Sequence, residues 1–274
     1  MLMLLVAASL LVHDVSGQVI VPSAKLRIIS TAPALTEILY AIGAGTNLVA
    51  ASDYCNYPKA ARLLPRIGSP RALNVEKIVS LRPLLIVAAA GTKDQWRALG
   101  QLTKAQVFMA EEGGVAAVLT NIRALGQVTG QFPEATELAR QVDRKIQEIS
   151  AKTRNQSRPR TFYMVWNDPL MTAGSGSFLD ELIGLAGGEN IGKNWHGVYP
   201  RLSWESLLWR PPEVLLGPRN LRAAVEATAR RLGVNYFATI DEDIISRPGP
   251  RIITALDLLH RAIHPATPST VNAR

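Results

Sequence analysis

The chain contains one helix-and-strand segment twice, about half its length apart. The segments "LNVEKIVSLRPLLIVA", from Leu73, and "LSWESLLWRPPEVLLG", from Leu202, align without a gap. Glu76 then meets Glu205, an offset of 129 positions (205 − 76). A polar cap residue, an acid in the first turn and a proline before an apolar run are typical of a short helix that leads into a buried strand. At 274 residues, the chain is long enough for two lobes that each carry this unit and a core of their own.

Short apolar runs alternate with helical segments in both halves. The first half has the runs "LRIIS", "NLVAAS", "LLIVAA" and "AQVFMA", and the second has "RTFYMVW", "EVLLGP" and "ATIDED". Between them, "EATELARQVDRKIQEISAKTRNQ" is helical for roughly 20 residues, a rod of ~30 Å. Alternating strands and helices indicate a parallel sheet. We therefore predict an α/β protein of two lobes, each with a central mostly parallel sheet and flanking helices, joined by one long backbone helix.

The predicted boundaries are a leader over 1–24, an N-terminal α/β lobe over 25–114, connecting helices over 115–158 and a C-terminal α/β lobe over 159–274. Residues Leu2 to Val12 form an apolar run that is too short to span a bilayer but typical of a signal-peptide core. Small residues at 16–17 and 23–24 are candidate cleavage sites. No Lys or Arg precedes this run, so a buried N-terminal strand is the alternative interpretation.

Charge pattern and cysteine content argue against a nucleic-acid partner and against an internal disulfide. The net charge is +8, but the basic residues are scattered through helical segments and form no stripe with aromatic residues, so we expect no nucleic-acid partner. Cys55 is the single cysteine, so it forms no internal disulfide, and its turn-rich context "SDYCNYP" indicates a structural role.

Two motifs resemble catalytic or metal sites but lack essential parts. "TAGSGSF" lacks the lysine of a phosphate-binding loop and does not match G-x-S-x-G. A hydrolase triad of Ser175, His196 and Asp168 therefore stays a remote alternative, and a turn capped by Ser177 is favoured. His260 and His264 have the i,i+4 spacing of zinc ligands, but no glutamate adjoins the first histidine, so we predict no metal site.

Five aromatic residues follow predicted strands: Tyr54, Tyr57, Trp166, Trp195 and Tyr199. In open α/β sheets, ligands bind outside the carboxyl ends of the strands. Aromatic loops at these ends favour a large flat ligand.

These motifs together resemble the class III periplasmic substrate-binding proteins of cobalamin, haem and iron-siderophore ABC importers. The resemblance runs from Leu26 to His264. It is carried by "ISTAPALTEILYAIGAG", "SDYCNYP", "NVEKIVSLRP", "DPLMTAGSGSFLDELIGLAGGENI", "YPRLSWESLL" and "PGPRIITAL". The stretches "YCNYP" and "YPRLSWE" are most similar to the cobalamin-binding branch.

The resemblance implies roles for particular residues. Glu76 and Glu205 match the glutamates that dock onto arginines of the two permease subunits. Tyr54 and Tyr199 match aromatic residues of the ligand pocket between the lobes, and the polar ligand-facing positions are Asp243 and Arg247. The chain departs from the family pattern at Pro70 and Ala89, where tryptophans stand elsewhere, and at Met171, which replaces a phenylalanine. Trp166 and Trp195 are candidates to compensate.

The expected function is therefore capture of a corrinoid in the cleft between the lobes and delivery to an ABC permease dimer. We expect a monomer that is not an enzyme and holds no cofactor or metal of its own. The periplasm is the expected location, with the chain free or attached to the membrane through an uncleaved N-terminus. The alternatives are a ferric siderophore or haem, with Tyr54, Tyr199 or His196 as iron ligand, and, more remotely, a secreted serine hydrolase.

Overall fold

The computed structural model describes residues 12–14, 17, 19–21, 23, 26–69, 71–89, 93–209 and 211–265. The chain divides into two compact units. Unit 1 comprises Met1–Glu112 and Ala116–Arg140, and unit 2 comprises Gly113–Val115 and Gln141–Arg274. The long helix α5 (Phe132–Thr153) has 22 residues, of which the first belong to unit 1 and the last to unit 2. The division therefore falls inside this helix rather than at its ends.

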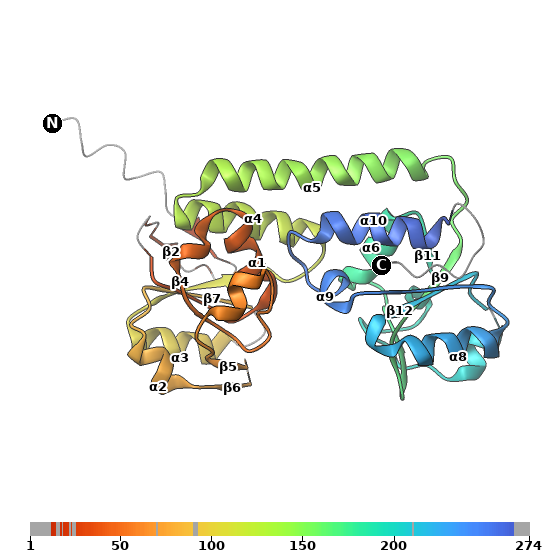
Figure 1. The fold of residues 1–274 in the computed structure, drawn as a ribbon, viewed down its shortest axis with the longest axis horizontal. Coiled ribbons are helices and arrows are strands. Elements are labelled where there is room, and N and C mark those ends of the chain that lie inside the picture. Colours follow the sequence, from red (N-terminus) through yellow and green to blue (C-terminus); the bar gives the residue numbers. More distant parts are fainter. Residues whose placement is uncertain are drawn as a thin grey trace. The chain divides into compact units, whose positions relative to one another are not determined.

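Unit 1 is built on a four-stranded sheet in which every pair is parallel. Its order is β4 (Leu48–Ala51), β3 (Ile28–Ser30), β7 (Leu85–Ala89) and β8 (Gln106–Ala110). The helices are α1 (Pro33–Ala41), α2 (Val75–Ser80), α3 (Lys93–Thr103) and α4 (Val115–Thr129), with 3₁₀ turns η2 (Ala44–Asn47) and η3 (Lys59–Leu63) and a hairpin of β5 (Gly68–Ser69) and β6 (Ala72–Leu73). Figure 1 shows α3 and α4 on opposite sides of β7.

Unit 2 repeats this plan with one added strand. The order is β10 (Leu170–Thr172), β9 (Arg160–Asn167), β12 (Val214–Pro218) and β13 (Tyr236–Ile240), and β11 (Glu189–Asn190) also pairs with β9. Only β10 is antiparallel to its neighbour among these described strands. The helices are α6 (Phe178–Leu185), α7 (Trp204–Trp209), α8 (Arg222–Leu232), α9 (Glu242–Ile245) and α10 (Ile252–Ile263), with η5 (Ile191–Asn194) and η6 (Arg219–Leu221). In Figure 1, α8 and α10 cover opposite sides of β12.

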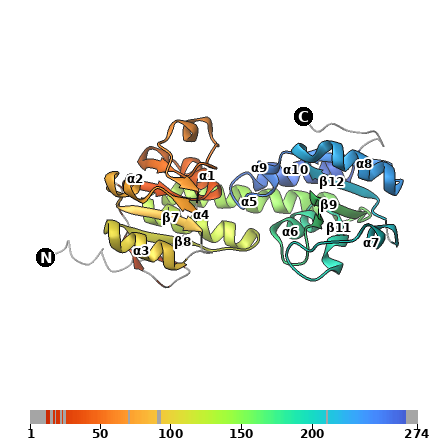
Figure 2. The same cartoon turned by 90° about the horizontal axis from the view of Figure 1, so that it is seen from below.

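The repeated sequence segment is a repeated structure. Helices α2 and α7 have six residues each, strands β7 and β12 five, and helices α3 and α8 eleven. Each second copy begins 129 positions after the first, the offset that separates Glu76 from Glu205. Figure 2 labels both short helices, α2 and α7. The predicted fold class, α/β with a mostly parallel sheet in each unit, is confirmed.

The cores of the two units use equivalent positions. In unit 1, one buried cluster between the sheet and α2 and α3 contains Ile78, Ile86 and Trp96. In unit 2, the residues 129 positions further on, Leu207, Leu215 and Val225, lie in the corresponding cluster beneath α7 and α8. The repeat therefore extends from the exposed acids to the residues that anchor their helices.

Part of the predicted leader packs onto unit 1. Strands β1 (Val12–His13) and β2 (Val19–Ile20) pair in antiparallel fashion, and β2 lies against β8. Ile20 is fully buried, and the Asp14 carboxylate accepts a hydrogen bond from the backbone N–H of Met109 at 2.9 Å. These contacts favour the buried-strand interpretation for residues 12–14 and 19–20, whereas residues 1–11 lie outside the described residues. Among the helices of the described chain, none is long and apolar enough to cross a membrane.

Candidate ligand-binding and docking sites

The ligand-facing candidate in unit 1 is the loop 52–57, which follows the carboxyl end of β4. It exposes two tyrosines, Tyr54 with 60% and Tyr57 with 47% of its surface accessible. Exposed aromatic side chains at the carboxyl ends of parallel strands are placed where such sheets bind ligands. Among the departures from the family pattern, Ala89 ends strand β7, which is separated from β4 by β3, and Pro70 lies outside the described residues.

Cys55 and Arg66 hold this loop in place. The Cys55 thiol is fully buried and lies 3.1 Å from the Thr36 hydroxyl, which donates to it, and 3.2 Å from the Ser52 hydroxyl. The Arg66 guanidinium donates to the carbonyl oxygens of Ser52 and Cys55, each at 2.9 Å. The buried, hydrogen-bonded thiol agrees with the structural role expected for Cys55, and Arg66 holds the backbone on both sides of Tyr54.

In unit 2, the candidate surface forms around β10. Met171 pairs with Trp166 of β9 and makes an isolated bridge to Arg201. Cross-strand partners share a face of the sheet, so these three side chains lie together. Trp166 is 48% exposed, and its indole N–H donates to the Asp168 carbonyl oxygen at 2.8 Å. Trp166 was expected in a loop but belongs to β9, because that strand continues far enough to pair with β10.

Tyr199 lies on the segment 198–202, which runs beside β10. The N–H of Thr172 donates to Pro200 O, that of Gly174 to Val198 O, and that of Leu202 to Leu170 O, at 2.9 to 3.2 Å. Tyr199 is 47% exposed, and partial burial raises the pKa of its phenol. The buried Tyr163 lies close by. Burial, together with the nearby Glu242 and Tyr199, raises the pKa of its hydroxyl. Both phenols are therefore neutral hydrogen-bonding groups near neutral pH.

The polar candidates Asp243 and Arg247 follow the carboxyl end of β13 on and after α9. The Arg247 guanidinium donates to Asp243 Oδ1 at 2.5 Å, and the Arg251 guanidinium donates to the Asp243 backbone oxygen at 2.8 Å. Only 12% of the Arg247 side chain is exposed. A ligand would therefore meet a neutralised ion pair at this edge rather than a free charge.

Trp195 has a different environment from Trp166. Like Trp204, it packs against the buried unit 2 cluster that contains Leu207 of α7. Its ring thus supports the core, and contact with a ligand stays a prediction for this residue. The different environments of Trp195 and Trp166 depend on tertiary packing, which local sequence does not reveal.

The glutamates Glu76 and Glu205 lie exposed in the first turns of α2 and α7. Both helices have the predicted caps: Asn74 Oδ1 accepts from the Lys77 N–H at 2.9 Å, and Ser203 Oγ from the Ser206 N–H at 3.4 Å. Hydrogen bonds from its own backbone N–H and from the Ser203 hydroxyl, together with the nearby Arg231, lower the pKa of Glu205. Its carboxylate is therefore held in the charged form that a cationic partner would recognise.

A hairpin that the sequence did not reveal connects the unit 1 loop to α2. The Asp53 N–H donates to Gly68 O at 3.1 Å, and the Asn74 N–H donates to Ile67 O at 2.9 Å. Gly68 has φ = +86°, and a Cβ there would lie 2.2 Å from the Ala72 oxygen, so only glycine fits. In the sequence, Gly68 was the one residue that could have indicated this turn.

The alternative sites lack the required geometry. Ser175, His196 and Asp168 are each exposed, and no hydrogen bond joins them within the described part of the chain. Ser177 caps α6 as predicted, accepting from the Asp180 N–H at 3.1 Å. No group of three or more His, Cys, Asp or Glu side chains suited to a metal occurs among the described residues.

Comparison with known proteins agrees with this arrangement. The family model described as periplasmic binding protein matches residues 28–256. A vitamin B12-binding protein of Yersinia pestis is 30% identical over 237 residues, which cover 85% of this chain and 84% of that protein. The crystal structure of the periplasmic vitamin B12 binding protein BtuF of Vibrio cholerae is 28% identical with a TM-score of 0.75, covering 87% of this chain and 97% of that one. The periplasmic heme-binding protein RhuT of Roseiflexus sp. RS-1 is 26% identical with a TM-score of 0.74, covering 87% and 99%. The chain therefore belongs to the periplasmic binding protein family.

Proposed function

We propose that this protein is a periplasmic cobalamin-binding protein that captures a corrinoid and delivers it to an ABC permease, without catalysing a reaction. The observation that carries this proposal is that the two units present equivalent surfaces. Each unit presents exposed aromatic residues at the carboxyl ends of its strands and one exposed glutamate on an equivalent, capped helix. The vitamin B12-binding relatives, similar over most of their length, support the choice of ligand.

A corrinoid suits the chemistry of these surfaces. Its flat macrocycle is a stacking partner for Tyr54 and Trp166, and its amide side chains need uncharged hydrogen-bonding groups. Tyr199 offers such a group, because its raised pKa keeps the phenol protonated.

Docking is the proposed role of Glu76 and Glu205, each meeting an arginine of one permease subunit. Charge pairs at the rim of an interface steer encounter and set register more than they add affinity. The partner is therefore a pair of permease subunits with cationic surfaces, and the protein acts in the periplasm as a monomer.

The test separates capture from delivery. Tyr54→Ala in unit 1 and Trp166→Ala in unit 2 should each weaken cyanocobalamin binding by about two- to tenfold, since each removes one exposed ring of ~0.5–1.5 kcal/mol stacking energy. Leu63→Ala, at a residue that is 87% exposed outside both surfaces, is the matched control.

The double variant Glu76→Ala with Glu205→Ala should keep its cyanocobalamin affinity and lose stimulation of the transporter ATPase. Unchanged binding in both aromatic variants would contradict the ligand surfaces. Lost cyanocobalamin affinity in the double glutamate variant, with stimulation intact at saturating ligand, would contradict the docking role.

A further inference from the structure

The two docking helices are equivalent in backbone but not in surface chemistry. In each, an aliphatic residue stands three positions after the glutamate: Val79 in α2, 40% exposed, and Leu208 in α7, 52% exposed. Four positions after the glutamate, α2 has Ser80, whereas α7 has Trp209. Residues at i, i+3 and i+4 share one face of a helix, so the indole lies on the face that presents Glu205.

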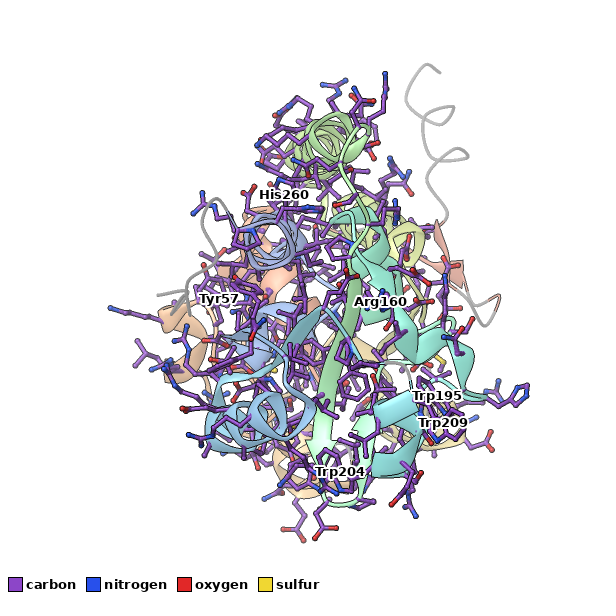
Figure 3. The ribbon with its side chains drawn as sticks, turned by 90° about the vertical axis from the view of Figure 1, so that its right-hand side faces the viewer. Tyr57, Arg160, Trp195, Trp204, Trp209 and His260 are labelled. Carbon is purple, nitrogen blue, oxygen red and sulfur yellow. The ribbon has the colours of Figure 1, made fainter. Side chains whose placement is uncertain are left out.

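Trp209 differs from its aromatic neighbours in having almost no cover. It is 90% exposed, more than any other large apolar side chain among the described residues. Figure 3 labels it together with Trp195 and Trp204. By contrast, Trp204 at the start of the same helix packs against the unit 2 cluster and lies under the Arg231 guanidinium, 4.7 Å from the ring centroid. Leu207 provides the buried anchor of α7, so Trp209 is not needed to hold the helix.

Resting on the proposed docking role of Glu205, we propose that Trp209 and Leu208 form an apolar anchor that inserts into a hydrophobic pocket on one permease subunit. Tryptophan is the residue type most enriched among the side chains that dominate binding energy at interfaces. Continuity with Glu205 on one helix face specifies a pocket beside the cation that pairs with this glutamate. Because α2 has Ser80 at the equivalent position, unit 2 makes the stronger of the two docking contacts.

The experiment replaces the anchor with the residue that the other unit carries. Trp209→Ser gives α7 the side chain of Ser80, and Leu63→Ser removes an equally exposed apolar residue from η3 as a control. Binding is measured by biolayer interferometry to the cognate permease–ATPase complex in nanodiscs, with empty nanodiscs of the same lipid in parallel. We expect Trp209→Ser to weaken binding by about 10- to 30-fold, with an unchanged thermal midpoint and cyanocobalamin affinity, and Leu63→Ser to change nothing.

Glu76→Ala and Glu205→Ala distinguish failure of this inference from failure of the docking role. If these variants weaken binding but Trp209→Ser stays within twofold, the anchor is wrong and the docking role stands. If neither glutamate variant weakens binding, the docking role itself fails.

Two further results would assign the indole to another partner and overturn the inference. One is binding to empty nanodiscs that Trp209→Ser abolishes, which would indicate a lipid surface. The other is a dimer, detected by light scattering, that Trp209→Ser dissociates.

Discussion

Leu207 holds the docking helix α7 in position, and its truncation should release that helix before the rest of unit 2. A helix of six residues is too short to be stable by itself, and Leu207 is its one buried residue. The side chain has no exposed surface and packs in the cluster beneath α7 and α8. Leu→Ala at such sites costs ~2.7–5 kcal/mol. Taking ~3 kcal/mol, the equilibrium for local opening of α7 should rise by about 100-fold.

Hydrogen exchange measured by mass spectrometry tests this expectation. In Leu207→Ala, the amides of 204–209 should exchange about 100-fold faster, whereas those of β12 should retain most of their protection. Leu208→Ala is the matched control, because that side chain is 52% exposed and its loss should change stability by less than ~0.5 kcal/mol. Leu207→Ala should also weaken docking and spare cyanocobalamin affinity. Unchanged exchange in 204–209, or a loss of protection that is equal throughout unit 2, would refute the reasoning.

Three further predictions concern pH and the N-terminal strands. Burial, and to a smaller extent the nearby His260, lowers the pKa of His264. Between this folded pKa and pH ~6.5, the unfolded chain therefore binds more protons than the folded protein. Stability should then fall as pH drops from 6.5 toward the folded pKa. Urea titrations between pH 5 and 8 should give a flatter dependence of the free energy of unfolding on pH for His264→Gln. An unchanged pH dependence in this variant would contradict the prediction. Lys145 and Lys152 lower the pKa of Glu148 to about 2, so its stabilising contribution is present above pH ~4.5 and lost as pH falls toward 2. Lys145→Met, which also removes the 3.1 Å ion pair with Asp257 of α10, should shift the acid unfolding midpoint upward by circular dichroism, and an unmoved midpoint would count against the network. Deletion through residue 24 should lower the thermal midpoint relative to deletion through residue 11, since it removes β1 and β2 from β8; equal midpoints would show that these strands contribute no stability.

The sequence predicted those features that depend on local pattern. The caps at Asn74, Ser177 and Ser203 follow from side chains that bond within three residues, and all three are present. The repeat was visible because its two copies need the same anchors, such as Ile78 and Leu207, at the same spacing.

Features set by long-range contacts were not predictable in the same way. Trp166 ends the apolar run "RTFYMVW", yet we expected it in the loop that follows, because nothing local shows that β9 continues far enough to pair with β10. Trp195 has the residue type and loop position of a ligand-facing aromatic residue, yet its neighbours in the fold are core residues. The apolar run before residue 24 has the same pattern whether it enters a membrane or a protein core. The contact of β2 with β8 and the Asp14–Met109 hydrogen bond favour the second for residues 12–14 and 19–20.

The most direct test of corrinoid capture is a calorimetric titration of the purified protein with cyanocobalamin, with hemin titrated in parallel and followed by visible absorbance. We predict one cyanocobalamin bound per chain and no shift of the hemin Soret band. A shifted Soret band with no heat from cyanocobalamin would contradict it, and the surfaces around Tyr54 and Tyr199 would then be those of a haem carrier.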